Sequence, residues 1–194
     1  MSSVVQAKKR NALYFMKQTF IIQATRPAQH SEIFTGVPAS ITIAQAILES
    51  GWGKYHMGKA NNYFGIKAHT IHGKVTYGKV ATGYIEKETK EHIKKLNKDI
   101  TIKAYFRSYK NMSDSFLDHG LFLKNNPRYY LILAIYAIKK DADEFAKGLQ
   151  KAGYATDPNY ADLLIKIMKQ NNLYQYNLKP TGKKSEKNNQ TMVA

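Results

Sequence analysis

The sequence predicts a mainly helical α+β domain over residues 1–176, with a small β-hairpin lobe at about residues 73–107. Apolar residues recur at helical spacing on both sides of that lobe. The lobe itself is rich in β-branched and aromatic residues and carries the polar segment KKLNK in its middle. The chain has 194 residues, which suits one domain plus tails and provides enough core to fold without disulfides.

The helical part begins with an expected helix over much of residues 4–24. We expect Pro27 to break this helix, because proline lacks a backbone N–H and its ring clashes with the preceding turn. A short second helix through Ile33 would end at Gly36. Pro38 then suits the first turn of the next helix.

The next helix carries the residue on which the functional interpretation depends. Glu49 lies one turn after Gln45 and three residues before Trp52, the only tryptophan of the chain. Gly51 and Gly53 then stop the helix. A carboxyl on the last turn of an apolar helix, next to an indole, is partly desolvated, and desolvation favours its protonated form. Glu49 is therefore a candidate proton donor, or else an exposed glutamate near a helix C-cap. The stripe at i, i+3, i+4 and i+7 consists of Ala44, Ile47, Leu48 and Gly51.

A turn and an extended segment, NNYFGIK, follow this helix. Asn61 and Asn62 suit left-handed or side-chain-bonded backbone. The residues from Tyr63 to Ile66 then begin an extended stretch.

The β-hairpin lobe contains the chain's other notable carboxyl groups. Strand alternation gives two sets of side chains on opposite faces, and only one set can look into a cleft. One set is Lys87, Thr89 and Glu91, and the other is Glu86, Glu88 and Lys90. Without further information, these residues form a solvated charged hairpin.

Helical patterns return from Ser113, a candidate N-cap. The run PRYYLILAIYAI predicts a strongly buried helix, since it is too short to span a bilayer. Asp141 predicts the start of another helix that Gly153 closes. Asp157 and Pro158 suit the N-cap and first turn of the final helix.

Composition limits the classes of function. The formal net charge is +16, which indicates an anionic partner, either nucleic acid or a bacterial wall. The lysines are scattered and no recognition motif occurs, so we expect no specific nucleic-acid binding. The basic segment 177–194 is predicted to be a disordered tail. No run of about 18 apolar residues occurs, so no membrane span is expected.

Metal and thiol chemistry are not expected. The chain has no cysteine, which excludes thiolate ligands and a thiol nucleophile. His56, His69 and His72 lack a metal-ligand spacing with a nearby carboxylate. We therefore expect no metal and no cofactor.

Five separated motifs, in order, resemble the family 73 glycoside hydrolases, the N-acetylglucosaminidases that cut bacterial peptidoglycan. The chain is similar to the glucosaminidase domain of flagellar rod-associated hydrolases and to phage lysins. The resemblance covers most of Ile41 to Asn172, and it implies a lysozyme-like helical lobe with a cleft between it and the hairpin lobe. The motifs are AQAILESGWG with NNYFGIK, TKEHIK, AYFRSY, KNNPRYY and AGYATDPNYADLL.

The resemblance assigns roles to individual residues. It implies that Glu49 is the general acid and that the Thr-x-Glu pattern at Thr89 makes Glu91 the second carboxylate, with Glu88 in reserve because the turn is longer than in the family. Tyr154 would lie beside the catalytic glutamate, although on its own it could equally be a packing tyrosine. Tyr63 either packs on a sugar or fills the core. The implied substrate-binding residues are Gln45, Trp52, Asn62, Tyr63, Phe64 and Tyr160.

The implied function is hydrolysis of the β-1,4 bond between N-acetylglucosamine and N-acetylmuramic acid by an endo-β-N-acetylglucosaminidase. A muramidase, a lytic transglycosylase and a non-catalytic wall-binding or phage structural module remain alternatives. Whether Glu91 activates water or orients the substrate's acetamido group stays open.

The expected partners are peptidoglycan glycan strands and the anionic wall surface, bound by a monomer. The N-terminal segment lacks a small-residue cleavage site, so we expect no signal peptide. An enzyme that acts on the wall would then reach it through phage lysis, phage delivery or specialised secretion.

Overall fold

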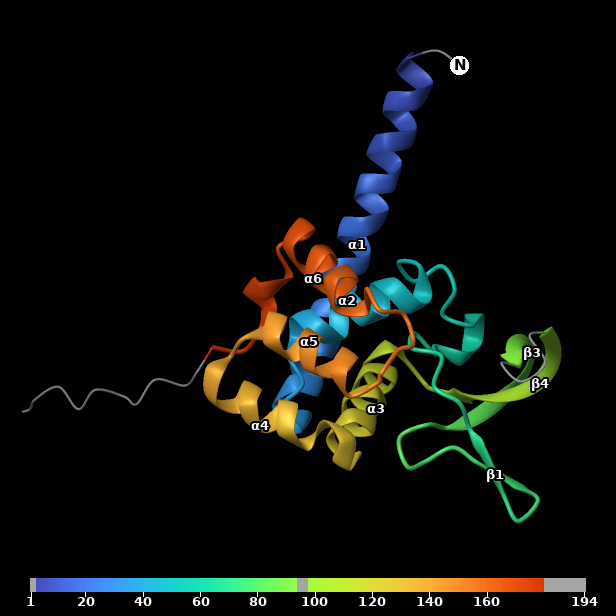
Figure 1. The fold of residues 1–194 in the computed structure, drawn as a ribbon. Coiled ribbons are helices and arrows are strands. Elements are labelled where there is room, and N and C mark those ends of the chain that lie inside the picture. Colours follow the sequence, from blue (N-terminus) through green and yellow to red (C-terminus); the bar gives the residue numbers. More distant parts are fainter. Residues whose placement is uncertain (1–2, 94–97, 180–194) are drawn as a thin grey trace, which may run out of the picture.

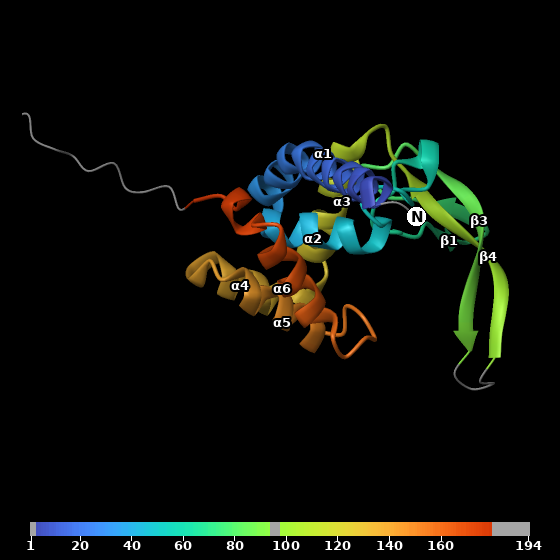
Figure 2. The same ribbon diagram turned by 90° about the horizontal axis from the view of Figure 1, so that it is seen from above.

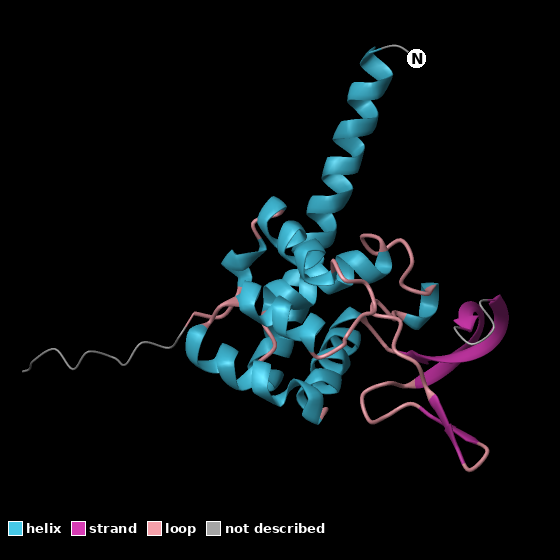
Figure 3. Cartoon of the chain, viewed as in Figure 1, coloured by secondary structure: helices cyan, strands magenta, loops and turns pink. Residues whose placement is uncertain are grey.

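The computed structural model describes residues 3–93 and 98–179, and side chains over residues 5–89 and 100–179. A helical domain carries two antiparallel β-hairpins on one side (Figures 1 and 3). This arrangement confirms the predicted fold class. The helices are α1 Ser3–Thr35, α2 Ala39–Ser50, α3 Met112–Lys124, α4 Tyr130–Lys139, α5 Ala142–Lys151 and α6 Tyr160–Gln170. The strands are β1 His69–Ile71, β2 Lys74–Thr76, β3 Gly83–Ile93 and β4 Lys98–Ser108.

Helix α1 runs without interruption through Pro27, so the predicted break is wrong. Ala24 and Ala28 on either side of the proline are fully buried, and Ser31 Oγ donates to Phe116 O of α3 over 3.0 Å. This packing outweighs the lost backbone bond. The first half of α1 projects away from the domain (Figure 1).

Helix α2 forms the centre of the domain, between α1, α3 and α6 (Figure 2). Its residues from Ala39 to Ile47 are all buried. Pro38 is the N-cap and not a first-turn residue. Gly51 adopts a left-handed conformation with φ of 57° and ends the helix, as the sequence predicted.

The hairpin lobe is divided differently from the prediction. Strand β2 pairs with β1 in a small hairpin of its own, while β3 pairs with β4. Residues 73–82 therefore do not belong to the large hairpin. The predicted turn at KKLNK falls mainly on residues outside the described part of the chain.

The later helices begin at slightly different residues from those expected. Asn111, and not Ser113, caps α3, because its Oδ1 accepts from Asp114 N over 3.0 Å. Asp141 caps α5 as predicted, by accepting from two backbone N–H groups. Helix α6 begins after Asn159, two residues beyond the predicted first turn.

Helix α4 contradicts the prediction of a strongly buried helix. Of its residues only Tyr136 is buried. The apolar run continues around the whole helix, but only one side of it faces α5 and the core.

The end of α1, the start of α2 and the C-terminal segment are joined by one buried carboxyl. Glu32 accepts hydrogen bonds from Ala39 N, Leu178 N and the Tyr136 hydroxyl, over 3.0, 3.1 and 3.0 Å. Asn177 Oδ1 also accepts from Ser40 N over 2.7 Å. The tail predicted from residue 177 therefore begins too early, since its first residues bond to the domain. Residues 180–194 lie outside the described part of the chain.

Candidate active site

A pocket of about 410 Å³ lies where α2 ends, beside the segment that leads into β1. It is bordered by α3, by β4 and by the loop that follows α5. Its lining residues are Glu49, Phe64, Gly65, Ile66, Lys67, His69, Arg107, His119, Phe122, Asn126, Arg128, Tyr129 and Tyr154.

Glu49 reaches this pocket because it is the last residue but one of α2. Its carboxyl is accessible to solvent within the pocket, and it makes no hydrogen bond or ion pair with any residue whose side chain the structure describes. Desolvation by the surrounding protein raises the pKa of Glu49. Its place at the negative end of the helix acts in the same direction. The arrangement provides an unpaired carboxyl that holds its proton more tightly than an ordinary glutamate.

Two stacked tyrosines lie next to this carboxyl. The rings of Tyr154 and Tyr160 are 5.4 Å apart at 27°, and Tyr160 Oη accepts from Gln45 Nε2 over 2.8 Å. Burial, helped by the charge of Glu49, raises the pKa of both hydroxyls. Both tyrosines are therefore neutral, so their hydroxyls can donate hydrogen bonds.

His119 contacts Tyr154 from α3. Its ring stacks on Phe64 with centroids 4.0 Å apart, and its Nε2 lies 3.3 Å from Tyr154 Oη. Burial lowers the pKa of His119 to about 3, so the imidazole is neutral at ordinary pH. Its Nδ1 is buried and has no hydrogen-bond partner.

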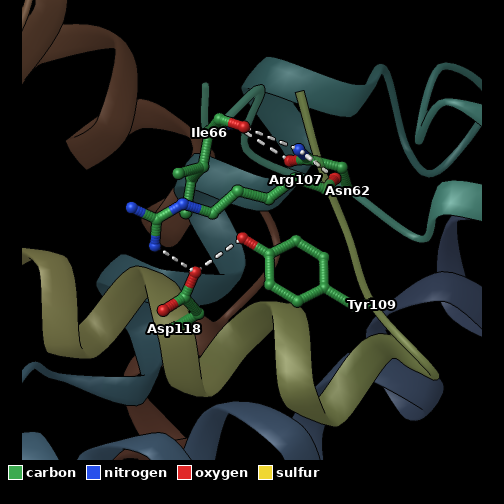
Figure 4. Close-up of polar contacts among 5 residues, drawn as sticks. All are labelled: Asn62, Ile66, Arg107, Tyr109 and Asp118. Atoms are coloured by element: carbon green, nitrogen blue, oxygen red, sulfur yellow. Dashed lines mark hydrogen bonds and ion pairs between the residues drawn. The ribbon is translucent and has the colours of Figure 1, made fainter. Parts of the chain in front are cut away.

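A polar network fixes β4 against α3 beside the pocket (Figure 4). Asp118 Oδ2 accepts from Arg107 Nη1 and from the Tyr109 hydroxyl, both over 2.7 Å. Asn62 donates to Ile66 O and Arg107 O over 3.0 and 2.9 Å and accepts from Ile66 N over 3.1 Å. These contacts hold the strand segment that lines the pocket in register with β4.

The structure brings together only some of the predicted site residues. Glu49, Phe64 and Tyr154 line the pocket. Tyr160 stacks on Tyr154 and accepts a hydrogen bond from Gln45. Asn62 is 1% exposed and its amide is occupied by backbone groups, so its position corrects the prediction of a substrate-binding side chain.

Trp52 and Tyr63 lie elsewhere. They line a separate hollow of about 310 Å³ together with Phe20. The indole is 6.3 Å from the Phe20 ring and lies under Lys17 Nζ at 4.8 Å. The predicted desolvation of Glu49 is correct in direction, although the indole and the carboxyl line different hollows. After Glu49 the chain turns away, and Trp52 itself has a φ of 64°.

Glu88 is not among the residues that line the pocket described above. The backbone register pairs Glu88 with Lys103 and position 91 with Ile100. Glu88 is exposed, and it shares a face with Arg107, which lines the pocket. The side chain of Glu91 lies outside the described residues.

Sequence reasoning missed His119, Arg107 and Tyr129. The position of His119 offers one signal: it follows Phe116 by three residues on the buried side of α3. A polar ring on an apolar helix face needs a partner. Arg107 gave no comparable signal, because its role depends on Asp118 of another element.

Three histidines were expected not to bind metal. In the part of the chain that the structure describes, no group of three or more His, Asp or Glu side chains could hold a metal ion. His69 instead lines the pocket, and His56 stacks on Tyr63 with centroids 5.1 Å apart.

The fold and the glutamate pocket define a glycoside hydrolase domain of lysozyme-like architecture. The chain belongs to the glucosaminidase family, described as mannosyl-glycoprotein endo-beta-N-acetylglucosaminidase, whose model matches residues 25–173. This confirms the resemblance that the sequence motifs predicted.

Two curated relatives support this family assignment. The chain is 36% identical over 185 residues to the peptidoglycan hydrolase FlgJ of Vibrio cholerae, covering 84% of this chain and 51% of FlgJ. It is 36% identical over 182 residues to the exo-glucosaminidase LytG of Bacillus subtilis, covering 91% and 59%. The chain thus spans about half the length of these curated relatives.

Solved structures are similar across most of the chain. The catalytic domain of the autolysin Auto from Listeria monocytogenes superposes with a TM-score of 0.69 at 28% identity, covering 91% of this chain and 98% of that one. A C-terminally truncated glycoside hydrolase domain of Salmonella typhimurium FlgJ gives a TM-score of 0.60 at 32% identity, covering 79% of this chain and 96% of that one.

Proposed function

We propose that this protein hydrolyses the β-1,4 bond between N-acetylglucosamine and N-acetylmuramic acid in peptidoglycan, with Glu49 as the general acid. The observation that carries the proposal is the unpaired carboxyl of Glu49 in a pocket that raises its pKa. The names of FlgJ and LytG, a peptidoglycan hydrolase and a glucosaminidase, support this choice of substrate.

In the proposed mechanism, Glu49 gives its proton to the glycosidic oxygen while the bond from that oxygen to the anomeric carbon breaks. The leaving sugar departs as a neutral alcohol. Positive charge then develops on the anomeric carbon and ring oxygen of N-acetylglucosamine, and the carboxylate that Glu49 has become lies beside it. Tyr154 is a neutral hydroxyl donor next to this carboxyl and orients the carboxyl or a substrate hydroxyl.

The second half of the reaction needs a nucleophile. A hairpin carboxylate, either Glu91 or its reserve Glu88, supplies it by activating a water molecule on the opposite face of the sugar, or it orients the substrate's own acetamido oxygen to attack the anomeric carbon. NMR of the first product separates these routes, because direct attack by water inverts the anomeric configuration and the acetamido route retains it. The variants Glu91→Gln and Glu88→Gln test the two carboxylates one at a time. Activity lost only in Glu88→Gln would exclude Glu91.

The test of the proposed function is a peptidoglycan zymogram followed by mass spectrometry of the products. The wild-type protein should release fragments with reducing-end N-acetylglucosamine, and Glu49→Gln should lose lysis by about 100-fold or more. Asp162→Asn, which changes an exposed carboxyl on α6, is the matched control and should keep full activity. Reducing-end N-acetylmuramic acid would indicate a muramidase, and its anhydro form a transglycosylase. Wall binding without lysis by the wild type would indicate a non-catalytic module.

The same digest distinguishes internal from terminal cleavage. We propose endo cleavage, which shortens long strands early in the reaction, whereas exo cleavage releases small fragments from strand ends. The comparison matters because LytG is named an exo-glucosaminidase.

We further propose that the protein acts as a monomer on the cell wall. Its charge of +16 favours the anionic wall surface and opposes self-association. The binding to purified walls should therefore weaken as salt is raised.

A further inference from the structure

Helix α4 exposes an apolar surface that the rest of the described chain does not cover. Its sequence is YLILAIYAIK. Tyr136 is buried, and Ile132 and Leu133 pack against the core. The opposite side is nevertheless also apolar: Leu131 is 70% exposed and Ile138 is 85% exposed. A helix that is apolar on all sides is normally buried on all sides, so this outer surface has the composition of a covered one.

The exposed residues form one stripe. Leu131, Ala134 and Ile138 stand at i, i+3 and i+7, which places them on one side of the helix. We call these three residues the α4 stripe. Beside it lies a groove of about 350 Å³ between α4 and α5, whose apolar lining includes Ile135 and Phe145. Figures 1 and 2 both place α4 at the edge of the helical domain, away from the large hairpin.

Basic side chains border this surface. Lys147 and Lys151 line the groove from α5, one helical turn apart, and Lys139 and Lys140 end α4. Glu144 also lines the groove, but it is paired with Lys139 over 3.1 Å. Asp141 and Asp143 are further acids at the start of α5, and Asp143 is paired with Lys169 over 3.5 Å.

We propose that the α4 stripe and its lysine border dock peripherally on an anionic lipid bilayer. An apolar helix face with lysines at its edge lies in the plane of such a surface, with apolar side chains among the acyl chains and ammonium groups at the headgroups. The stripe lies on the surface and does not cross it: no helix in the described ranges is long and apolar enough to span a membrane.

A second copy of the chain fits this surface less well. Each copy carries a formal net charge of +16, so two copies repel each other, and the lysines at the border would face one another. An anionic bilayer would instead attract the lysines that border the stripe.

The first half of α1 is a competing membrane-binding element. It exposes Leu13 and Phe15, by 46% and 68%, and it carries basic residues. Its exposed apolar residues are spread around the helix, because Leu13, Tyr14 and Phe15 are consecutive. Phe15 and Ile22 share a side, but the helix as a whole is neither apolar nor amphipathic. The α4 stripe is therefore the better candidate, and α1 supplies the control.

Docking through α4 would have a consequence for the pocket. Asn126, Arg128 and Tyr129 line the pocket and lead directly into α4. A protein held by this stripe would keep its pocket close to the bilayer surface. This consequence depends on the proposed function, whereas the lipid binding itself does not.

The test is sedimentation of the full chain with vesicles of phosphatidylcholine alone or with 30% phosphatidylglycerol, on the order of the anionic content of cell membranes. We expect binding to the anionic vesicles that falls with salt and is at least tenfold weaker in the double variant Leu131→Glu/Ile138→Glu. Lys147→Glu/Lys151→Glu should weaken it as well. The control Leu13→Glu/Phe15→Glu should bind as the wild type does.

Several outcomes would overturn the proposal: equal binding to both kinds of vesicle, binding that survives the α4 changes, or loss only in the α1 control. Dimerisation in light scattering that the α4 changes abolish, without vesicle binding, would assign the stripe to a second copy. Circular dichroism checks that each variant is folded. Lysis of soluble peptidoglycan fragments is measured in parallel and should be unchanged, so failure of lipid binding is separable from failure of the hydrolase.

Discussion

The buried imidazole of His119 makes a quantitative prediction about stability and pH. His119 is 1% exposed, and burial lowers its pKa from the ordinary 6.5 to about 3. In the unfolded chain the same imidazole takes up a proton near pH 6.5. This imidazole therefore makes the free energy of unfolding larger above pH 6.5, and the contribution is lost progressively as the pH falls toward 3. Replacing His119 by glutamine removes the titrating group.

The size of the effect follows from the two pKa values. Between pH 6.5 and 4.5 the unfolded state binds the proton and the folded state does not, which lowers the free energy of unfolding by roughly 3 kcal/mol in total. In a chain of this length that corresponds to about 5–10 °C in melting temperature.

The assay is urea unfolding of the wild type and His119→Gln at pH 7 and pH 4.5. The wild type should lose about 2–3 kcal/mol more than the variant between the two pH values, whatever the variant loses at pH 7. Other carboxyls and histidines titrate in both proteins and cancel in this difference. His72→Gln, in the exposed β1–β2 turn, leaves His119 in place and should behave as the wild type. Equal pH dependence in the wild type and His119→Gln would refute a buried neutral imidazole.

Three further predictions test other parts of the structure. Because burial raises the pKa of Glu49, the alkaline limb of the pH–activity profile should lie above the ordinary glutamate value of 4.5, activity being lost as pH rises through it; a limb absent from the profile would contradict Glu49 as the acid. Tyr136→Phe removes the hydroxyl that donates to the buried Glu32 over 3.0 Å and should cost about 1.5–3 kcal/mol in urea unfolding; a loss under about 0.5 kcal/mol would show that water replaces it. Gly120→Ala places a methyl group against Ser31 Oγ and 2.8 Å from Thr35 Oγ1 and should cost about 1–3 kcal/mol by overpacking, measured by thermal melting; an unchanged melting temperature would mean that α1 and α3 separate easily.

The fold class could be predicted from the sequence because it depends on local patterns. Apolar spacing identified the central helix, and Gly51 identified its end, since a left-handed residue is needed there. Asp141 identified the start of α5 for the same kind of reason. Structural features that depend on residues within about four positions of each other can be predicted from the sequence.

The predictions failed where contacts between segments far apart in the sequence determine the structure. Pro27 stays helical because Ser31 bonds Phe116 far along the chain, and no local pattern reports that contact. Asn62 had the right residue type for a substrate contact, but its amide bonds to Arg107 O of another element. The apolar run of α4 predicted a buried helix, but the described chain provides nothing to cover its outer side.

The candidate site shows the same difference between local signals and contacts between distant segments. The motif around Glu49 predicted an acid held near the end of a helix, and the pocket there agrees. The partners that shape its surroundings come from α3, β4 and the loop after α5. Their positions follow from the Asp118 network and from the stacking of Phe64 on His119, neither of which has a sequence period.

The position of Glu49 two residues before Gly51 meets both of the opposing demands on the general acid that we propose. The carboxyl must be desolvated enough to keep its proton, yet open enough for a sugar oxygen to reach it. Earlier positions of α2, from Ala39 to Ile47, are buried, so a carboxyl there would be closed to substrate. Beyond Gly51 the chain leaves the helix and turns toward a different hollow. The last turn of α2 is thus the part of the helix where an acid is both surrounded by protein and accessible from the pocket.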